Sequence, residues 1–142
     1  GRFNDSVCIV LADLDDFKAV NDQYGHPCGD DVLREFAKTL EETVREIDVA
    51  GRWGGEEFAL ILPGTDATGG AALAERARAR FESRVIHAPN GDRIPVTASF
   101  GVAAFPEGGD MPTLVAAADA ALYRAKRAGK NRVVTAAEVS RR

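Results

Sequence analysis

The 142-residue sequence predicts an α+β fold in which helices pack on the faces of one sheet. Three observations support this prediction. Short apolar runs have the length of strands, longer segments repeat apolar residues at helical spacing, and clusters of Gly, Pro, Asn and Asp separate them. In chain order these segments predict a strand, two helices, a hairpin, a helix, a strand, a helix and a final strand.

A strand, two helices and a hairpin account for the first half of the chain. The apolar run from Val7 to Ala12 is typical of a buried strand. Leu33, Phe36 and Leu40 lie on one stripe of a long helix, and Gly54-Gly55 is the turn of the hairpin. We therefore expect a strand over 6–13, a short helix over 17–24, a longer helix over 30–47, and hairpin arms over 48–53 and 57–62.

The second half contains two helices and two strands. Asp66 or Thr68 caps the first of these helices, and Gly129 is a natural end for the second. We expect a helix from that cap to about residue 85, a turn over 89–92, and a strand over 94–104, either alone or paired with an irregular strand before it. A helix from Pro112 or Thr113, a strand over 132–135 and a frayed polar tail over 136–142 follow.

Composition and charge limit the classes of function. With 45% apolar and 28% charged residues, the chain has the composition and size of one soluble globular domain. The net charge of −4 argues against broad binding to DNA or RNA, which usually needs a basic surface. The longest apolar run is far too short for insertion into a membrane. Cys8 and Cys28 have neither metal nor redox spacing, which fits a cytoplasmic location.

Acidic residues gather at two points of the predicted sheet. Gly54-Gly55-Glu56-Glu57-Phe58 places two adjacent carboxylates at the tip of the hairpin, and Asp13-Leu14-Asp15-Asp16 follows the first strand. Paired acids beside a core strand repel each other unless a cation offsets their charge. Hard divalent cations prefer carboxylate oxygens and commonly serve phosphates. The sequence therefore predicts one hard-metal site that handles a phosphate ligand.

Further motifs follow one another in a defined order. They include Asp13-Leu14-Asp15-Asp16-Phe17-Lys18, Asn21-Asp22, Gly25-His26, Gly29-Asp30, Arg52-Trp53-Gly54-Gly55-Glu56-Glu57-Phe58, Ala98-Ser99-Phe100-Gly101-Val102-Ala103 and Ala118-Asp119-Ala120-Ala121-Leu122-Tyr123. Together with the order of elements, they resemble the GGDEF family of diguanylate cyclases from about Val7 to Arg132. The resemblance implies a ferredoxin-like, palm-type fold of the nucleotidyl-cyclase kind, with a central, mostly antiparallel sheet flanked by helices. It also implies formation of cyclic di-GMP from two GTP molecules.

The resemblance implies roles for the acids. Asp13, Glu56 and the backbone carbonyl of Leu14 are expected to hold Mg²⁺ or Mn²⁺, with two ions per active site. Glu57 is expected to bind the second ion or to contact the attacking 3′-hydroxyl. Asp13, Glu56 and Glu57 are therefore the candidate catalytic residues. Glu56 stands where the family name has Asp, a variant that active members also carry. The alternative is that these acids are solvated loop residues.

Four residues are candidates for binding the phosphates. Backbone N–H groups of Phe17 and Lys18, at the start of the short helix, can bind phosphate oxygens. Lys126 and Lys130 are four residues apart near the end of the last helix, so they lie close together. By resemblance they grip the phosphates, although Lys130 lacks the bidentate fork of the Arg that the family often has there. Alternatively, the two lysines are a solvated helix end favoured by the helix dipole.

Two residues match the positions at which the family reads guanine. Asp30 can accept hydrogen bonds from guanine N1–H and the amino group, while Asn21 can donate to O6 or accept from the amino group. Adenine would leave Asp30 facing the wrong partners. The alternative role of Asp30, compatible with the first, is to cap the long helix after Gly29.

A candidate feedback site lies before the hairpin. Arg45 and Asp48 form an Arg-x-x-Asp motif that many family members use to bind the inhibitory product, and Arg76 falls where the family often supplies a second Arg. Arg suits phosphate and the guanine Hoogsteen edge, and Asp suits guanine N1–H and its amino group. The alternative is a surface ion pair worth less than about 1 kcal/mol.

The two-fold symmetry of cyclic di-GMP implies a homodimer with one GTP per subunit. Family members usually carry further segments upstream, so we expect residues 1–142 to be one catalytic module of a longer signalling protein, which can be a membrane-anchored sensor with this module in the cytoplasm. One competing hypothesis is a catalytically silent module that binds GTP or cyclic di-GMP as a receptor. Another is a different palm-type nucleotidyl transferase. Retention of Glu56 and Glu57 argues against the first, and the pair Asn21 and Asp30 argues against the second.

Overall fold

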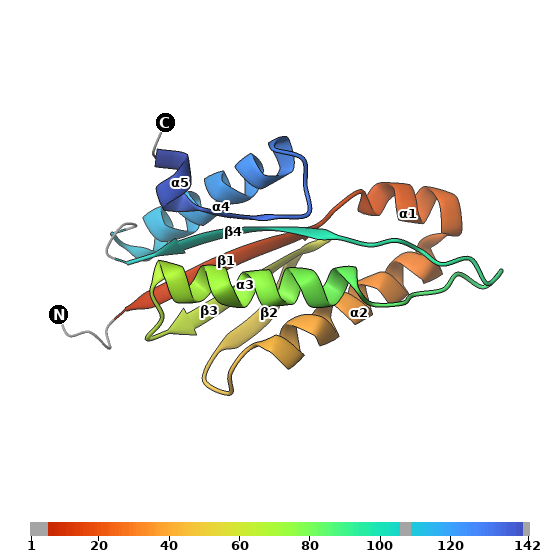
Figure 1. Ribbon diagram of the computed structural model, residues 1–142, viewed down its shortest axis with the longest axis horizontal. Helices are drawn as coiled ribbons and strands as arrows, with labels where there is room; N and C mark the ends of the chain where they lie inside the picture. The colour runs from red at the N-terminus through yellow and green to blue at the C-terminus, as the bar shows by residue number, and fades with distance from the viewer. Residues whose placement is uncertain (1–5, 106–108, 141–142) are drawn as a thin grey trace.

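A five-stranded mixed sheet lies at the centre of the molecule, with helices on both of its faces (Figure 1). The computed structural model describes residues 6–105 and 109–140. The strands are β1 (Val7–Leu14), β2 (Val49–Gly54), β3 (Glu57–Pro63), β4 (Ala98–Ala104) and β5 (Val133–Thr135). The helices are α1 (Phe17–Tyr24), α2 (His26–Thr43), α3 (Ala67–Glu82), α4 (Met111–Arg127) and α5 (Ala136–Ser140).

The strands lie in the order β2-β3-β1-β4-β5, so β1 is the central strand. β1 pairs antiparallel with β3 and with β4, and β2 pairs antiparallel with β3. β5, in contrast, is parallel to β4. The first four strands have the connections and order of a ferredoxin-like unit. The prediction of an α+β fold with a mostly antiparallel sheet flanked by helices is therefore confirmed.

Alternation along β1 divides its side chains between the two faces of the sheet. Val10 and Ala12 belong to the core cluster that α2 and α3 cover, whereas Ile9 and Leu11 pack with residues of α4. Figure 1 shows α4 and α5 on one side of the sheet and α2 and α3 on the other. Asp13 continues the second set, so the same period of two directs it toward α4.

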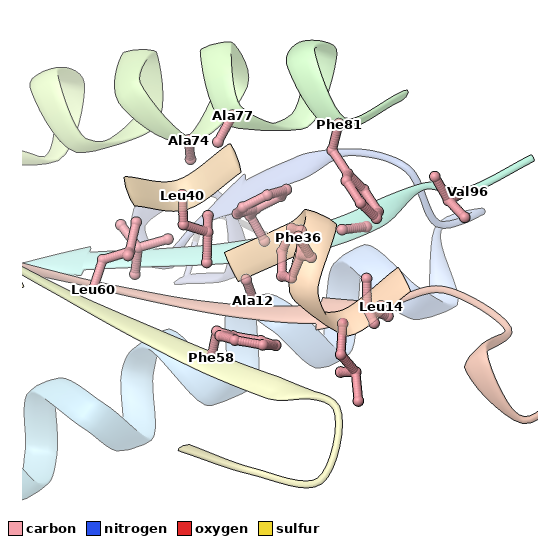
Figure 2. Packing of buried hydrophobic residues seen from close by; sticks show 14 of the residues in the cluster. Ala12, Leu14, Phe36, Leu40, Phe58, Leu60, Ala74, Ala77, Phe81 and Val96 are labelled. Atoms are coloured by element: carbon pink, nitrogen blue, oxygen red, sulfur yellow. The ribbon is translucent and has the colours of Figure 1, made fainter. Parts of the chain in front are cut away.

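Phe36 of α2 lies in the middle of the larger core cluster (Figure 2). Its ring centroid is 5.0 Å from that of Phe58 on β3, 4.7 Å from that of Phe81 on α3 and 6.1 Å from that of Phe100 on β4. Such tilted and edge-to-face pairs contribute about 0.5–1.5 kcal/mol each beyond the burial of their area. Phe58 is the last residue of the Gly-Gly-Glu-Glu-Phe motif, so this cluster anchors the hairpin that carries the two acids.

α4 approaches β4 closely at Gly101. A Cβ atom at this position would overlap the backbone oxygen of Ala118 and the backbone nitrogen of Leu122, and it would lie 2.9 Å from the Leu122 Cα. Glycine is therefore required at this contact. The contact fixes the distance of α4 from the sheet, and with it the position of Lys126 in the last turn of the helix.

α2 begins earlier than predicted. Its first residue is His26 rather than residue 30, and Pro27 lies in the first turn, where a missing N–H breaks no helical hydrogen bond. Asp30 therefore lies inside the helix, and its alternative role as an N-cap is wrong. The sequence signal for the true start was Pro27 itself.

The strand predicted over 94–104 is shorter than expected, because β4 begins at Ala98. The preceding residues form an irregular hairpin, in which the Ile94 N–H donates to the Ile86 carbonyl at 2.8 Å and His87 pairs with Arg93. Figure 1 shows this segment projecting beyond α2 at one end of the sheet. Buried Ile94 and Val96 continue the alternation of a strand, so the apolar pattern alone could not mark where β4 begins.

The tail was predicted to be frayed over 136–142, which is wrong for residues 136–140, where α5 forms; residues 141–142 lie outside the described residues. Thr135 and Glu138 explain this helix. The Thr135 N–H donates to Glu138 Oε1 at 2.8 Å, and the Glu138 N–H donates to Thr135 Oγ1 at 3.3 Å. These reciprocal bonds form a capping box, a start signal that the sequence contains as Thr-x-x-Glu.

α2, with 18 residues, is the longest of the helices named above. Within the part of the chain that the structure describes, no helix combines the length and the apolarity needed to cross a membrane.

Candidate functional site

The acids of the first strand and of the hairpin meet at one end of the sheet. Asp13 on β1 lies opposite Glu57 on β3 and Ser99 on β4 in the strand register. Because directly opposed residues share a face of the sheet, Asp13 and Glu57 both project toward α4. The structure thus brings together two acidic motifs that are far apart in the sequence.

The Gly-Gly turn determines where Glu56 lies. Gly55 has a φ of 47°, a left-handed conformation that favours glycine. Arg52 Nε donates to the Gly55 carbonyl at 2.7 Å. The Glu56 carbonyl accepts a hydrogen bond from the Leu14 N–H at 3.4 Å, which ties the turn to the end of β1. Glu56 is therefore held within reach of Asp13, half-buried beside it.

Asp13 lies in surroundings that disfavour a lone negative charge. Its Oδ1 atom is buried and has no hydrogen-bond partner among the described residues. Burial raises the pKa of Asp13 to about 7; Lys126 opposes this rise, and the charges of Glu56 and Glu57 reinforce it. A bound cation would offset both the burial and the repulsion. Asp13 is therefore suited to be a cation ligand.

Lys126 extends from α4 directly into this acidic cluster. Its Nζ donates to the Leu14 carbonyl at 3.0 Å and to Asp15 Oδ1 at 2.8 Å. The same Nζ lies 3.5 Å from Asp13 Oδ1. Lys126 is thus not part of a solvated helix end, because it neutralises acids at the end of β1.

Asp15 was not singled out by the sequence, yet it has the most enclosed carboxylate of this cluster, with a side chain 1% exposed. Thr97 Oγ1 and Ser99 Oγ donate to it at 2.8 and 2.7 Å, and the backbone N–H of Asn131 donates at 2.9 Å. Burial acts to raise the pKa of Asp15, but hydrogen bonds from Lys126, Ser99 and Thr97 outweigh it and hold the pKa below its usual value. Asp15 therefore joins β1, β4 and the chain after α4.

The other predicted phosphate ligands surround the start of α1. Asp16 precedes the helix with a φ of 56° and makes no side-chain hydrogen bond to cap it. Lys130 Nζ lies 2.6 Å from Asp16 Oδ1, so it reaches the start of α1 from the loop between α4 and β5. The Lys18 side chain instead pairs with Asp22 along α1, at 3.0 Å. Phe17 and Lys18, whose backbone N–H groups are the candidate phosphate ligands, both lie in the first turn of α1.

The two candidate guanine-reading residues come from neighbouring helices. Asn21 lies on α1 and packs against Gly29 of α2, the residue before Asp30. Asp30 is exposed and lines a groove of about 530 Å³ between α2 and β2. The groove is also lined by Leu33, Ala37, Gly51, Arg52 and Phe58. The structure therefore places Asn21 against the residue before Asp30, and Asp30 beside a groove between α2 and the hairpin.

Arg45 and Asp48 lie in the loop after α2, because this helix ends at Thr43 rather than at residue 47. The Arg45 N–H donates to Asp48 Oδ2 at 2.8 Å, and Arg45 Nη2 donates to Asp48 Oδ1 at 2.7 Å. The Asp48 side chain is fully enclosed, at 0% exposure, while that of Arg45 is 47% exposed. Burial acts to raise the pKa of Asp48, but these hydrogen bonds outweigh it and lower the pKa. Asp48 thus holds Arg45 in place through a buried carboxylate, whereas both partners of a surface ion pair would be exposed.

Arg45 and Arg76 line a second groove, of about 510 Å³, whose other lining residues include Thr65, Asp66 and Leu73. Thr65 Oγ1 accepts a hydrogen bond from Arg45 Nη2 at 2.8 Å. Arg76 is exposed on α3. The structure therefore brings the two predicted feedback arginines to one groove, with Asp48 beneath Arg45.

Asp13 and Glu56 can hold a metal only with help from other ligands. Among residues 6–105 and 109–140, no group of three or more His, Cys, Asp or Glu side chains is arranged to hold a metal ion. Mg²⁺ usually takes one or two carboxylates and completes its shell with waters and substrate phosphates. Two carboxylates, an orphaned buried oxygen and a nearby backbone carbonyl fit a cation of this kind.

Replacing Asp13 by Asn is expected to stabilise the metal-free protein at pH 8 but not at pH 4. The unfolded chain releases the Asp13 proton near pH 4, whereas the folded chain keeps it up to about pH 7. The parent therefore loses stability as the pH rises through this window, by at most about 4 kcal/mol. Urea unfolding at both pH values, without divalent metal, measures the difference. Asp119→Asn on the exposed face of α4 is the control; equal effects of the two variants would contradict the assignment.

The sequence matches the family model described as "Diguanylate cyclase, GGDEF domain" over residues 2–132. The chain belongs to the GGDEF family. The GGDEF chain is 44% identical over 126 residues to the uncharacterized protein YhcK of Bacillus subtilis, covering 88% of this chain and 35% of YhcK. It is 41% identical over 134 residues to diguanylate cyclase A of Treponema denticola, covering 94% of this chain and 36% of that protein. The chain thus spans about a third of the length of these relatives.

The fold of this GGDEF domain matches that of solved family members. The GGDEF domain of DgcB from Caulobacter crescentus, solved in complex with c-di-GMP, superposes with a TM-score of 0.88 at 36% identity. The match covers 93% of this chain and 78% of the other. GGDEF diguanylate cyclases use a divalent metal, which agrees with the donor set at the end of β1.

Proposed function

We propose that this GGDEF domain is a diguanylate cyclase, which condenses two GTP molecules into cyclic di-GMP and releases pyrophosphate. The observation that carries the proposal is the convergence of Asp13, Glu56 and Glu57 with Lys126 at one end of the sheet. Family membership and the named cyclase relative support the same reaction. Because GTP is a cytoplasmic nucleotide, the proposal also implies a cytoplasmic location.

The metal would be held by Asp13, Glu56 and the Leu14 carbonyl, as Mg²⁺ or Mn²⁺ with two ions per active site. When bound, such an ion lowers the pKa of a coordinated hydroxyl and offsets charge that develops on the phosphate. Glu57 lies opposite Asp13 in the register, so it can hold the second ion or orient the attacking hydroxyl. Lys126 now donates to the Leu14 carbonyl. We expect it to transfer this contact to a phosphate oxygen when GTP binds.

The triphosphate would lie between the start of α1 and the end of α4. Backbone N–H groups of Phe17 and Lys18 lie at the positive, N-terminal end of the α1 dipole, where anions bind. Lys130 is held at the same place by Asp16, and its flexible ammonium can exchange this exposed partner for a phosphate. The base would reach Asp30, whose carboxylate can accept from guanine N1–H and the amino group, and Asn21, whose amide can donate to O6 or accept from the amino group.

The reaction needs two copies of the domain, because each would hold one GTP. The 3′-hydroxyl oxygen of one GTP forms a bond to the α-phosphorus of the other, and the bond from that phosphorus to the β-phosphate bridging oxygen breaks. Pyrophosphate leaves with this electron pair, and the proton of the attacking hydroxyl is released to solvent. A second, symmetric step closes the ring, which is why a two-fold symmetric homodimer is the simplest catalyst.

Incubation with Mg²⁺ and GTP at high protein concentration, followed by chromatography, tests the proposed function. Cyclic di-GMP and pyrophosphate are the expected products. Binding of GTP or cyclic di-GMP without any product would instead favour the receptor hypothesis. Conversion of single nucleotides to a cyclic mononucleotide would favour another palm-type transferase.

Product inhibition at the Arg45 groove is a further part of the proposal. Arg76→Ala is expected to raise the half-inhibitory concentration of cyclic di-GMP by about tenfold, because it removes one charge-assisted contact, and to leave the initial rate and the stability unchanged. Arg45→Ala is expected to relieve inhibition too, but also to destabilise the fold, because Asp48 would be left buried without its partner. Initial rates across product concentrations measure both effects. Arg127→Ala, which removes an exposed arginine elsewhere, is the control. If added cyclic di-GMP does not inhibit the parent protein, the feedback site is wrong.

A further inference from the structure

Asn21 takes its position from packing rather than from a hydrogen bond to its amide oxygen. Its Oδ1 atom is buried and has no hydrogen-bond partner among the described residues. Buried amides are usually anchored by hydrogen bonds. Without a donor for Oδ1, the shape of the surrounding surface must determine where this amide lies.

The surface in question is Gly29, which is buried in α2 directly before Asp30. A Cβ atom at Gly29 would overlap Asn21 Oδ1, and it would lie 2.9 Å from Asn21 Cγ and 3.2 Å from Phe17 Cζ. The Asn21 amide thus fills the space that a side chain at position 29 would occupy. Glycine weakens a helix by about 1 kcal/mol relative to alanine, so its presence here serves this contact rather than the helix.

We infer that the missing side chain at Gly29 sets guanine specificity, because it seats the Asn21 amide against α2 beside Asp30. The inference rests on the proposed function, in which Asn21 and Asp30 read one base edge from two different helices. The Asn21 amide on α1 can lie next to Asp30 only because α2 has no Cβ atom at position 29. Gly29 acts through Asn21, so it is a positioning residue.

Gly29→Ala tests the inference directly. The added methyl group meets mainly the end of a short side chain, so the Asn21 amide gives way and the fold persists. The readout is the affinity for GTP relative to ATP, because adenine carries an amino donor where guanine carries the O6 acceptor that the Asn21 amide nitrogen can bind. Both nucleotides are bound to the 142-residue chain with Mg²⁺ and measured by thermal shift. We expect the preference for GTP to fall by about 5–10-fold, the effect of one hydrogen bond, to the level of Asn21→Ala.

A double variant and a matched control separate this effect from simple destabilisation. In Asn21→Ala with Gly29→Ala, the methyl group has no amide to displace, so the preference should equal that of Asn21→Ala alone. Gly70→Ala is the control, because Gly70 is also a buried helical glycine, and its Cβ atom would overlap Cys8 Sγ and lie 3.1 Å from Val102 Cγ1. This control should lower the melting temperature without changing the preference for GTP.

The outcomes distinguish the inference from the proposed function. If Asn21→Ala loses the preference and Gly29→Ala keeps it, the inference is wrong, whereas the role of Asn21 stands. If Asn21→Ala itself keeps the preference, the guanine-reading role and the inference are both wrong. A Gly29→Ala chain that does not fold would also contradict the inference, because the methyl group would then disturb more than the Asn21 amide.

Discussion

Replacing Glu56 by Gln is expected to reduce the formation of cyclic di-GMP by at least about 100-fold, while the fold is retained. The substitution keeps the shape of the side chain but removes the charge that would help Asp13 to hold a divalent cation. Metal-assisted stabilisation of a phosphoryl transition state is worth several kcal/mol, and each 1.4 kcal/mol is about tenfold in rate. Initial rates with Mg²⁺ and GTP, together with urea unfolding of the variant, measure both parts of this prediction.

Two further measurements make the Glu56 result specific. Glu46→Gln changes an exposed acid in the loop after α2 and should leave the rate unchanged. Raising the Mg²⁺ concentration should recover part of the activity of Glu56→Gln, because a weakened site fills at higher concentration. Full turnover in Glu56→Gln at low Mg²⁺ would remove Glu56 from the metal site.

Asp15→Ala is expected to lower the free energy of unfolding by about 3–5 kcal/mol, the usual effect of breaking a buried ion pair. The substitution removes the acceptor for Lys126, Thr97, Ser99 and the Asn131 N–H together. Lys126 lies on α4, Ser99 on β4, Thr97 just before β4 and Asn131 just before β5. The substitution therefore removes hydrogen bonds that connect several elements of the fold. Urea unfolding at pH 7 measures the difference from the parent.

The effect of Asp15→Ala should depend on pH in a defined direction. The pKa of Asp15 is lowered in the folded state, so its stabilisation is present above about pH 4 and is lost as the pH falls through the lowered pKa. The deficit of the variant should therefore shrink as the pH falls below about 4 and through this lowered pKa. Asp16→Ala removes the neighbouring acid, whose side chain is 64% exposed, and should cost less than about 1 kcal/mol. Equal losses for the two variants would mean that Asp15 is not the buried hub.

The general fold was predictable because its signals are local. The apolar run at Val7–Ala12 and the hairpin arms predicted on either side of Gly54-Gly55 all correspond to strands that the structure contains. The acids at Asp13 and Glu56 follow directly from these strands, since a strand end and a hairpin tip carry them to the same edge. The family prediction is confirmed by the match over residues 2–132.

What could not be predicted depends on contacts between distant segments. Asp15 is one of four consecutive positions that contain three acids, and only the placement of Thr97 and Ser99 shows that it is the buried one. The helical stripe continued past Thr43, yet the Asp48 carboxylate draws the Arg45 N–H out of the helix. α5 could have been predicted from its capping box, whereas the enclosure of Asp48 could not.

The contact between Lys126 and the end of β1 joins residues 113 positions apart, and the contact between Asn131 and Asp15 spans 116 positions. Contacts so distant along the chain close late and slow the folding reaction. A ribosome-bound fragment that ends before α4 would therefore carry the acids of β1 and the hairpin without the lysine that neutralises them. Nucleotide binding should therefore appear only when the final quarter of the polypeptide has been synthesised. It should be lost when that quarter is removed by truncation.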